Sequence, residues 1–306
     1  MITKFPIVTG DQRSRIIEAG TGSREIWLVH GIGGRADRWR PCMQRLAQAG
    51  YRVRAVDLPG HGFASRTPGH RYSVAAFSAF LLDTLRDNVE GSSLALVGAS
   101  FGGQLALRAA LEFHARVPDR RLDALVLCAP TGVTPLGSSL CEGLADGLDR
   151  IGRGRAGNGR AGGGRAGSDW ADSGQVGSGQ VGSDPVRARL GFVTGLTGHE
   201  LDLLVEEEQR VMSLPGTAEA LAGIAAMVRG ELDAEPLVGR LAELAVSLPV
   251  LQIWGEDDRY IPAELGRRIA DQVPELTSVV LPGTGHMPYL QQPESFCERI
   301  IRFLKG

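Results

Sequence analysis

Short apolar runs alternate along this chain with segments whose apolar residues recur at the spacing of an amphipathic helix. From the third run onward the apolar residues are nearly continuous, which is typical of strands covered on both faces. This alternation predicts the α/β class, with a mostly parallel sheet, helices on both faces and ligands above the carboxyl ends of the strands. The predicted strands are Ser14–Glu18, Glu25–Val29, Tyr51–Val56, Leu94–Val97, Ala124–Cys128, Val250–Ile253 and Ser278–Leu281. The predicted helices are Arg38–Ala49, Val74–Asn88 (with Ser73 as its N-cap), Gly103–Phe113, Ala263–Gln272 and Pro293–Phe303.

The alternation stops between about Pro130 and Pro249, where no buried strand pattern is present. We therefore predict a core built from residues 1–130 and 249–306, with a helical cap at 131–248 inserted above the end of a strand. Helical periodicity within the cap is visible at Glu200–Met212, Thr217–Val228 and Leu237–Ala245. We expect most apolar residues of these helices to pack the cap together and a minority to line a pocket beneath it. The candidates are Leu203, Leu204, Val211, Met212, Leu221, Ile224 and Met227.

Residues 152–183 form a low-complexity tract within the predicted cap. Gly-Arg-Ala-Gly occurs at 154–157, 159–162 and 164–167, and Ser-Gly-Gln-Val-Gly at 173–177 and 178–182. A segment so rich in glycine and poor in apolar residues cannot offset the entropy lost on ordering, so we predict a disordered loop. The alternative is an arginine–glycine arm for nucleic acid. It is disfavoured because Trp170 has no aromatic companions in the tract and Asp169 and Asp172 lie beside it.

The chain is close to neutral, with a formal net charge of −2. It therefore gives no electrostatic reason to expect a nucleic acid or an anionic membrane as partner. No apolar run approaches the length of a membrane span, and the first residues lack the pattern of a signal peptide. The four cysteines, Cys42, Cys128, Cys141 and Cys297, lack the spacing of a zinc site or a disulfide framework. We expect a cytoplasmic protein with no metal.

The segment Gly98-Ala99-Ser100-Phe101-Gly102 joins the predicted strand at Leu94–Val97 to the helix that follows it. A serine with glycines two residues before and after it, on a strand–turn–helix unit, is the pattern of a nucleophile elbow. The serine takes a strained backbone conformation that projects its hydroxyl above the sheet, and small neighbours allow the close packing that holds it there. Ser100 is therefore the predicted nucleophile.

A serine hydroxyl is a weak nucleophile until a base takes its proton. Among the six histidines, His286 follows the last predicted strand, Ser278–Leu281, from where it can reach back toward Ser100. The order of serine, acid and histidine along the chain also favours it. His30 and His61 lie in turns after earlier strands, and we interpret the role of His30 as structural. We therefore predict His286 as the base.

The orienting acid is expected in the loop that follows Val250–Ile253, where Glu256, Asp257 and Asp258 are adjacent. A buried carboxylate beside the histidine fixes its tautomer and stabilises the imidazolium that forms. Position along the chain alone does not distinguish Asp257 from Asp258.

Backbone N–H groups must stabilise the oxyanion that develops when a serine attacks a carbonyl. Phe101, at the start of the predicted helix, supplies one. The segment His30-Gly31-Ile32-Gly33-Gly34 supplies the second, with Ile32 preferred and Gly33 as the alternative. This glycine-rich loop does not match the G-x-G-x-x-G pattern and lacks a Walker lysine, so it gives little support to a nucleotide site.

Taken together, these motifs resemble the α/β-hydrolase superfamily, in its serine-nucleophile branch. The matching segments span nearly the whole chain apart from the cap, and the tract at 152–183 departs from the family pattern. They are His30–Gly34, Asp57–Gly62, Gly98–Gly103, Trp254–Pro262 and Gly285–Pro288. The resemblance implies an eight-stranded, mostly parallel sheet with a helical cap after the sixth strand. It also implies a catalytic triad, with Asp258 selected over Asp257 by the family's G-x-x-D-x-x-x-P loop.

The resemblance favours a cofactor-independent serine hydrolase acting on a carboxylic ester or related acyl compound. The apolar character of the cap helices favours a small-molecule substrate that is apolar or mixed. C–C bond hydrolysis of a dienone-type ring-cleavage product is the main alternative, because Ser100–Gly103 and His30-Gly31 also resemble that branch. Thioester or lactone hydrolysis and acyl transfer would use the same triad. A non-catalytic ligand receptor is a third alternative, disfavoured by the complete triad. The serine at position 100 also argues against the branches whose nucleophile is an aspartate.

Overall fold

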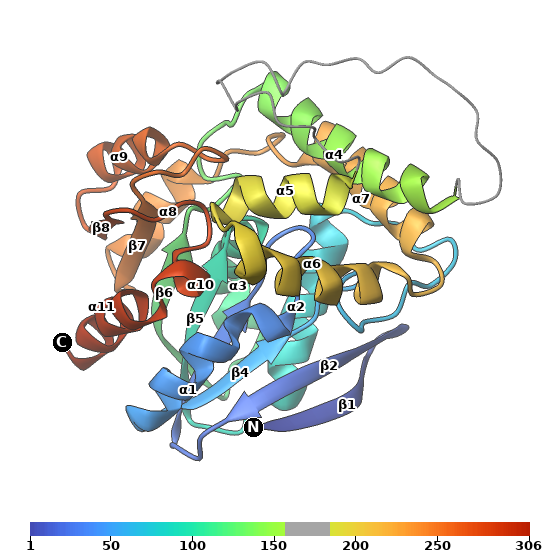
Figure 1. Cartoon of the computed structure of the whole chain (residues 1–306). Helices are drawn as coiled ribbons and strands as arrows, with labels where there is room; N and C mark the ends of the chain where they lie inside the picture. Colours follow the sequence, from blue (N-terminus) through green and yellow to red (C-terminus); the bar gives the residue numbers. More distant parts are fainter. Residues whose placement is uncertain (157–183) are drawn as a thin grey trace.

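An eight-stranded sheet lies at the centre of the structure, a computed structural model that describes residues 1–156 and 184–306 (Figure 1). The strand order is β1-β2-β4-β3-β5-β6-β7-β8. The pairs β1–β2 and β2–β4 are antiparallel and the remaining pairs are parallel. The strands are β1 Ile2–Thr9, β2 Gln12–Ala19, β3 Arg24–Val29, β4 Arg52–Val56, β5 Ser93–Ala99, β6 Arg121–Cys128, β7 Val250–Gly255 and β8 Thr277–Leu281. The predicted α/β class and mostly parallel sheet are confirmed.

Each predicted strand is present, with its ends shifted by a few residues. Strand β1 was not predicted individually, because its pattern is unlike that of a buried strand. It is an edge strand that is mostly exposed, it contains Pro6, and its register against β2 shifts between Lys4 and Ile7. Proline is tolerated in such edge and bulge positions. The eight strands that the family resemblance implied include this one.

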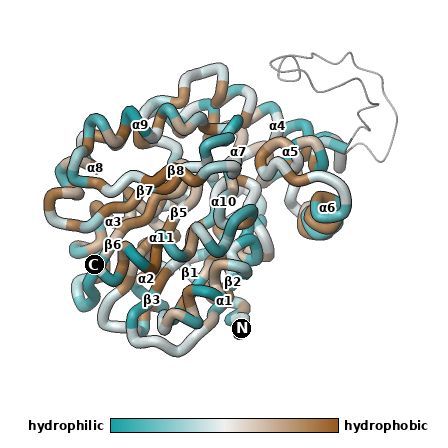
Figure 2. Tube along the Cα trace, turned by 60° about the vertical axis from the view of Figure 1, so that its left-hand side comes forward, coloured by the Kyte–Doolittle hydropathy of each residue, from teal (hydrophilic) through white to brown (hydrophobic). Residues whose placement is uncertain are grey.

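Helices cover both faces of the sheet and build two apolar layers. One layer contains α1 and α11, and the other contains α2, α3 and α9. Figure 2 shows the hydrophobic strands β5, β7 and β8 running between these helices. The core helices are η1 Ala36–Trp39, α1 Arg40–Gln48, α2 Val74–Asn88, α3 Phe101–Arg116, α9 Ala263–Gln272, α10 Pro288–Gln291 and α11 Pro293–Lys305. Helix α2 has its predicted N-cap, because the Ser73 hydroxyl accepts a hydrogen bond of 3.1 Å from Ala76 N–H.

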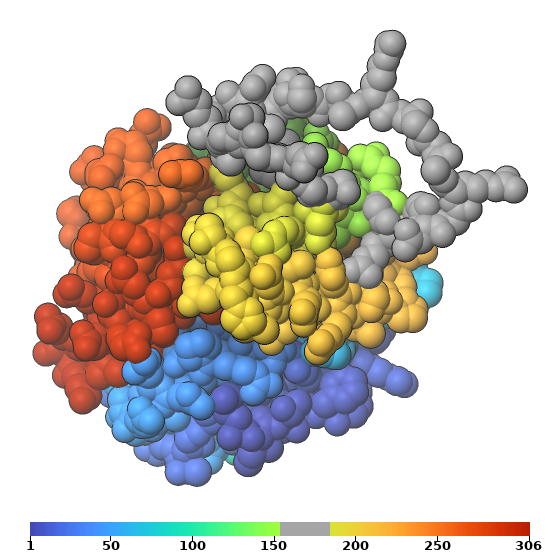
Figure 3. Space-filling view, in the orientation of Figure 1, coloured from blue at the N-terminus to red at the C-terminus, as the bar shows by residue number. Residues whose placement is uncertain are grey.

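A helical cap lies between β6 and β7 in the chain, as predicted. Figure 3 shows the cap surface meeting both the N-terminal and the C-terminal parts of the core. Two of its helices, α4 and α5, have no counterpart in the sequence prediction. The cap region contains α4 Ser138–Ala156, α5 Pro185–Thr194, α6 Gly198–Met212, α7 Thr217–Glu231 and α8 Val238–Ala245. Helix α8 packs against α3 and α9, so it belongs with the core rather than with the predicted cap.

Most of the predicted cap residues pack among the cap helices, as expected. Val211, Met212, Leu221, Ile224 and Met227 are buried. Leu203 is an exception, since 52% of it is exposed.

The predicted low-complexity tract begins differently in the structure. Residues 152–156 form the last turn of α4 instead of opening a loop, and residues 157–183 lie outside the described part of the chain. Within the described residues, no single helix has the length and apolar composition of a membrane span. The helices α6 and α7 are bent by 101° relative to each other. They reach the length and apolar composition of a span only when they are counted together. Both helices bury most of their apolar residues inside the protein, with Leu203 of α6 as the exposed exception.

Candidate active site

Ser100 occupies the sharp turn between β5 and α3. Its backbone angles are φ 54° and ψ −121°, in a region that costs a non-glycine residue about 1–3 kcal/mol. Backbone hydrogen bonds hold this conformation. The N–H of Ser100 donates to the Cys128 carbonyl at 2.8 Å, and its carbonyl accepts from Gly103 N–H at 2.9 Å. The predicted elbow is therefore present, and its strain is compensated by the end of β6 and the first turn of α3.

Glycines at the elbow allow backbone segments to approach each other more closely than a side chain would permit. A Cβ atom on Gly98 would lie 2.2 Å from the Gly102 carbonyl oxygen, and one on Gly102 would lie 2.3 Å from the Val29 carbonyl oxygen. Both distances are shorter than a carbon–oxygen contact allows. The strand β5, the helix α3 and the end of β3 therefore converge at Ser100 because these positions carry no side chain.

The loop after β3 lies directly beside the serine. A Cβ atom on Gly31 would stand 2.9 Å from Ser100 Cβ and 3.4 Å from Ser100 Oγ. The loop turns tightly, with Gly34 N–H donating to the Gly31 carbonyl at 2.9 Å and Gly33 at φ +67°. Ile32 is partly buried in this turn. Phe101, the residue after the serine, is fully buried at the N-terminus of α3, where its N–H is not used by the helix. Phe101 and the turn that contains Ile32 thus both adjoin Ser100, and their role as oxyanion donors stays a prediction.

His286 and Asp258 form a hydrogen-bonded pair above the ends of β7 and β8. His286 Nδ1 lies 2.8 Å from Asp258 Oδ2. The other carboxylate oxygen, Oδ1, accepts from the N–H groups of Tyr260 at 2.8 Å and Ile261 at 2.9 Å. These bonds fix the carboxylate, and a fixed carboxylate orients the imidazole with Nε2 free to face a substrate. Asp258 is buried, whereas Asp257 and Glu256 are exposed, so the structure pairs Asp258, and neither of its neighbours, with His286.

Two other buried histidines near this site are held in neutral, structural roles. His30 Nε2 accepts from Leu58 N–H at 3.0 Å, so its Nδ1 carries the proton and donates to the Gly31 carbonyl at 2.8 Å. Burial lowers the pKa of His30 to about 4. Burial, with the neighbouring His30, lowers the pKa of His61 to about 3. These residues brace the turns after β3 and β4, which agrees with the structural role predicted for His30.

Two residues that the sequence did not single out connect the cap to the site. Arg189, on α5, donates from Nη2 to the Ile32 carbonyl at 2.6 Å. Tyr260, in the loop after β7, lies with its ring centroid 4.9 Å from that of His286. The Arg189 guanidinium is close enough to the Tyr260 side chain to act electrostatically on its hydroxyl group, and both residues line one cavity. Neighbouring residues therefore connect the loop beside Ser100, through Arg189 and Tyr260, to His286.

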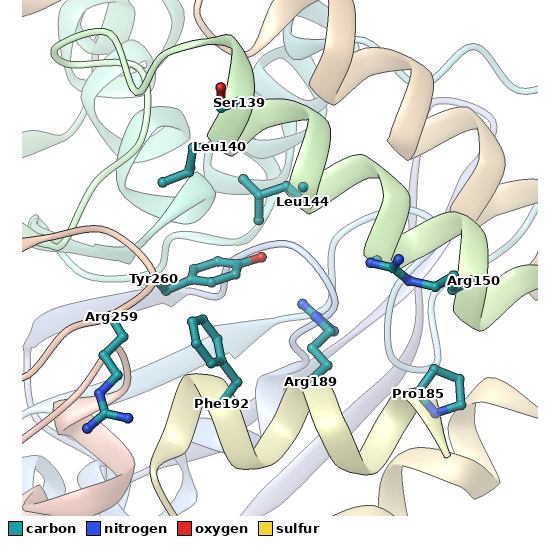
Figure 4. Close-up of a pocket in the computed structure, with 11 residues that line it drawn as sticks. Ser139, Leu140, Leu144, Arg150, Pro185, Arg189, Phe192, Arg259 and Tyr260 are labelled. Atoms are coloured by element: carbon teal, nitrogen blue, oxygen red, sulfur yellow. The ribbon is translucent and has the colours of Figure 1, made fainter. Parts of the chain in front are cut away.

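A cavity of about 310 Å³ lies next to these residues, between α4, α5 and the loop after β7. Figure 4 shows Leu140 and Leu144 projecting from α4 on one side, and Arg189 and Phe192 from α5 on the other. Tyr260 separates them and faces the cavity. The lining residues are Ser139, Leu140, Gly143, Leu144, Gly147, Arg150, Pro185, Arg189, Phe192, Arg259 and Tyr260.

None of the seven cap residues proposed from the sequence lines this cavity. The expectation that a minority of them would do so is therefore wrong for this cavity, because α4 and α5 occupy the position instead. A signal for α5 does exist in the sequence. Asp184 caps the helix by accepting from Val186 N–H at 3.0 Å, Pro185 begins it, and Gly195 ends it in the left-handed conformation. Nothing in the sequence pattern indicates that Arg189 would reach the loop at Ile32.

Within residues 1–156 and 184–306, no group of three or more histidine, cysteine or acidic side chains is placed to hold a metal ion. All four cysteines are buried and unpaired with one another.

Comparison with known proteins agrees with this geometry. Residues 28–299 match the model of the alpha/beta hydrolase family. The chain is 26% identical over 301 residues to the 2-hydroxy-6-oxononadienedioate/2-hydroxy-6-oxononatrienedioate hydrolase of Burkholderia vietnamiensis, covering 94% of this chain and 89% of that protein. It is 26% identical over 299 residues to the pimeloyl-[acyl-carrier protein] methyl ester esterase of Edwardsiella ictaluri, covering 94% and 95% respectively.

The fold is shared with a thermophilic esterase from Thermogutta terrifontis, with a TM-score of 0.69 at 22% identity over 99% of this chain and 97% of that one. The family match covers the elbow, the loop after β3 and both loops that carry the His286–Asp258 pair. The chain therefore belongs to the alpha/beta hydrolase family and has the general character of a hydrolase.

Proposed function

We propose that this protein hydrolyses a carboxylic ester or a related acyl compound through a covalent acyl-enzyme on Ser100. The observation that carries the proposal is the hydrogen bond of 2.8 Å between His286 and Asp258. The loops of this pair and the strained elbow serine all follow parallel strands of one sheet, so they lie at the same edge of it. An oriented histidine is what a serine hydroxyl needs to become a nucleophile. The relatives named above include an esterase, which supports the same class of reaction.

In the proposed acylation, the Ser100 hydroxyl oxygen attacks the substrate carbonyl carbon while His286 Nε2 takes the hydroxyl proton. Asp258 stabilises the imidazolium that results. The carbonyl oxygen becomes an oxyanion and receives hydrogen bonds from the N–H groups of Phe101 and Ile32, with Gly33 as the alternative to Ile32. Preorganised donors of this kind typically contribute about 10²–10³ in kcat each. The tetrahedral intermediate then collapses, and His286 gives its proton to the departing alkoxide.

In the proposed deacylation, a water molecule takes the place of the leaving alcohol. His286 removes a proton from the water, whose oxygen attacks the acyl carbon, and the same two amides bind the second oxyanion. When this intermediate collapses, Ser100 recovers its proton from His286 and the carboxylic acid is released. Every proton transfer uses residues of this chain, so the cycle needs no cofactor.

The cavity between α4 and α5 supports a substrate with an apolar portion. Leu140, Leu144 and Phe192 contribute its apolar lining, while Arg189 and Tyr260 link it to the site at His286. A volume of about 310 Å³ falls at the small end of the range typical of sites for small molecules. We propose a small apolar or mixed acyl compound.

The test is turnover of p-nitrophenyl esters by matched variants. Ser100→Ala should lose nearly all activity, with the melting temperature retained. Asp258→Asn should lower kcat by about 10⁴, because it stabilises the wrong histidine tautomer. Asp257→Asn is the control, since its side chain is exposed, and it should turn over esters like the wild type. Equal activity in Ser100→Ala, or equal loss in the two asparagine variants, would contradict the proposal.

Hydrolysis of a C–C bond in a ring-cleavage product is the second candidate. It is favoured by the similarity, over 94% of this chain, to the Burkholderia vietnamiensis hydrolase whose substrates are hydroxy-oxo-dienedioates and trienedioates. The two candidates differ in one measurement. Turnover of a vinylogous diketone with poor activity on simple esters would favour C–C cleavage, and the reverse would favour the ester reaction.

A further inference from the structure

Arg189 is the cap residue that contacts the loop beside the nucleophile. Its Nη2 donates to the Ile32 carbonyl at 2.6 Å. Its guanidinium also lies against Gly33, where a Cβ atom would overlap with it at 2.2 Å. Gly33 therefore does two things: it adopts a positive φ and leaves room for the cap arginine.

The Ile32 carbonyl belongs to the part of the loop that is easiest to reorient. Gly31 to Gly34 form a tight turn closed by the Gly34 N–H bond to Gly31, and a positive φ at its third residue is characteristic of type II. Type I and type II turns differ by a flip of the peptide between their second and third residues, which here is the Ile32–Gly33 peptide. A donor held against the Ile32 carbonyl keeps that peptide in one orientation.

The other end of the turn is already fixed by the core. His30 donates from Nδ1 to the Gly31 carbonyl at 2.8 Å and is tied to the turn after β4 through Leu58 N–H. The Gly31–Ile32 peptide, which carries the proposed Ile32 N–H donor, is therefore anchored by the core at its own carbonyl. The next peptide, Ile32–Gly33, carries the alternative Gly33 N–H donor and is anchored by the cap.

Tyr260 lies beside the arginine in the same cavity lining. Its ring packs against the His286 ring at 4.9 Å between centroids. Its own N–H donates to Asp258 Oδ1 at 2.8 Å. Figure 4 shows Arg189 rising from α5 toward the Tyr260 side chain. The position of Arg189 is thus linked to the loop that carries the acid as well as to the loop beside the serine.

We propose that Arg189 is a positioning residue of the oxyanion hole, which it holds in its active form from the cap through the Ile32 carbonyl. This inference rests on the proposed function and goes beyond it, because it makes the cap a part of the catalytic apparatus. With the cap displaced or Arg189 removed, the Ile32–Gly33 peptide reorients and turns away the Gly33 N–H that it carries. The adjoining Gly31–Ile32 peptide, which carries the Ile32 N–H, then loses its support on the cap side. Misplacement of a catalytic group by about 1 Å can cost as much as 10²-fold in rate.

An arginine at this position could instead bind an anionic group of the substrate. The structure favours positioning, since the guanidinium already donates to the Ile32 carbonyl and lies against Gly33. The two roles differ in their kinetics. A positioning residue affects kcat for every substrate, whereas an anion-binding residue affects KM only for substrates that carry a negative charge.

The experiment compares Arg189→Met and Arg189→Lys with Arg187→Met, using a neutral p-nitrophenyl ester and one with a free carboxylate on its acyl chain. Arg187 lies on the same helix and forms an exposed ion pair with Asp202, so its variant is the matched control. We expect Arg189→Met to lower kcat by about tenfold to a hundredfold on both esters, with KM nearly unchanged. Arg189→Lys should lose less, because an ammonium group can still donate to the Ile32 carbonyl. The control should retain wild-type kinetics.

Inhibition by a neutral trifluoromethyl ketone gives a second readout, because its adduct with serine places an oxyanion in the same hole. Its inhibition constant should rise in proportion to the fall in kcat/KM for the Arg189 variants, with melting temperatures close to the wild type. Unchanged kcat on the neutral ester, or a rise in KM confined to the charged ester, would overturn the inference. The proposed function would survive either result. It fails separately if the wild-type protein hydrolyses neither ester.

Discussion

The backbone of Ser100 is held in a conformation that serine rarely adopts, and the surrounding residues supply the free energy that keeps it there. The hydrogen bonds to Cys128 and Gly103 and the glycines at positions 98 and 102 act together at one turn. The buried histidines near this turn differ in what their ring nitrogens contact. The His286–Asp258 pair is oriented for proton transfer, whereas His30 and His61 are buried, neutral and engaged with backbone groups.

The two neutral histidines predict how stability depends on pH. Their pKa values in the folded protein, about 4 for His30 and about 3 for His61, lie below the ordinary value of 6.5. Below pH 6.5 the unfolded chain therefore takes up protons that the folded chain does not, so the free energy of unfolding falls with pH. For His30 the loss extends from pH 6.5 to about 4 and amounts to roughly 3 kcal/mol.

Urea unfolding at a series of pH values measures this dependence. His30→Gln keeps an acceptor for Leu58 N–H but cannot titrate, and it should make the fall in stability between pH 6.5 and 4 shallower. His199→Gln, at an exposed position on α6, is the control and should leave the slope unchanged. An unchanged slope in His30→Gln would show that His30 is protonated in the folded protein.

Residue by residue, the sequence allows a prediction for groups whose chemistry depends on local motifs. Ser100, Phe101, Ile32 and His286 each follow a strand, and the ends of parallel strands meet at one edge of a sheet. Arg189 could not be found in this way. Its partner, the Ile32 carbonyl, is 157 residues away in the chain, and a backbone carbonyl leaves no mark in the sequence.

At the scale of elements, the site depends on the close packing of α3 against the end of β3. Gly102, in the first turn of α3, faces the carbonyl oxygens of Val29 and His30 at hypothetical Cβ distances of 2.3 and 2.5 Å. Both contacts are with backbone atoms, which cannot move aside as a flexible side chain would. The register of α3 on the sheet is therefore set by the absence of a side chain at position 102.

Gly102→Ala tests this packing. It should destabilise the protein by about 1–3 kcal/mol or more, because the added methyl group overlaps with two carbonyl oxygens, and it should reduce ester turnover by moving Ser100. Gly230→Ala, in α7, adds a methyl group where no atom lies within 4 Å and should be neutral or stabilising by up to about 1 kcal/mol. Chemical denaturation of both variants gives the comparison, and equal stabilities would refute the account of the elbow.

Helices were predicted correctly where apolar residues recur at a clear helical spacing. They were missed where glycines interrupt that spacing. The bounds of α2 and α9 were predicted to the residue. Helix α4 was missed because Gly143, Gly147 and Gly152 interrupt its apolar face, and glycine favours helices poorly. Here the packing of α4 against α7 outweighs its own weak propensity.

At the scale of the whole molecule, buried charges join the cap to the core. Glu208 on α6 receives hydrogen bonds from Arg35 and from Arg38, the latter at 2.7 Å, and the side chains of all three are 3% exposed. The neighbouring Glu207 also pairs with Arg35, at 2.5 Å, but its side chain is 59% exposed. Losing one member of a buried set leaves an uncompensated charge, whereas losing an exposed member is largely compensated by water.

Glu208→Gln and Glu207→Gln therefore form a matched pair. The first should lower the free energy of unfolding by about 3–5 kcal/mol, since Arg35 and Arg38 remain buried beside a neutral amide. The second should change it by less than about 1 kcal/mol. Urea denaturation at neutral pH measures both. Similar small effects in the two variants would mean that the cap is held to the core by apolar contacts rather than by this cluster.

Ser100 should become acylated during turnover. The decisive measurement is to react the protein with a p-nitrophenyl ester, quench in acid during the first turnovers, and map the added acyl mass by peptide mass spectrometry. We expect the acyl group on the peptide containing Ser100 and none on that peptide in Ser100→Ala. Turnover of the ester with the acyl group on another residue, or with full activity in Ser100→Ala, would contradict it.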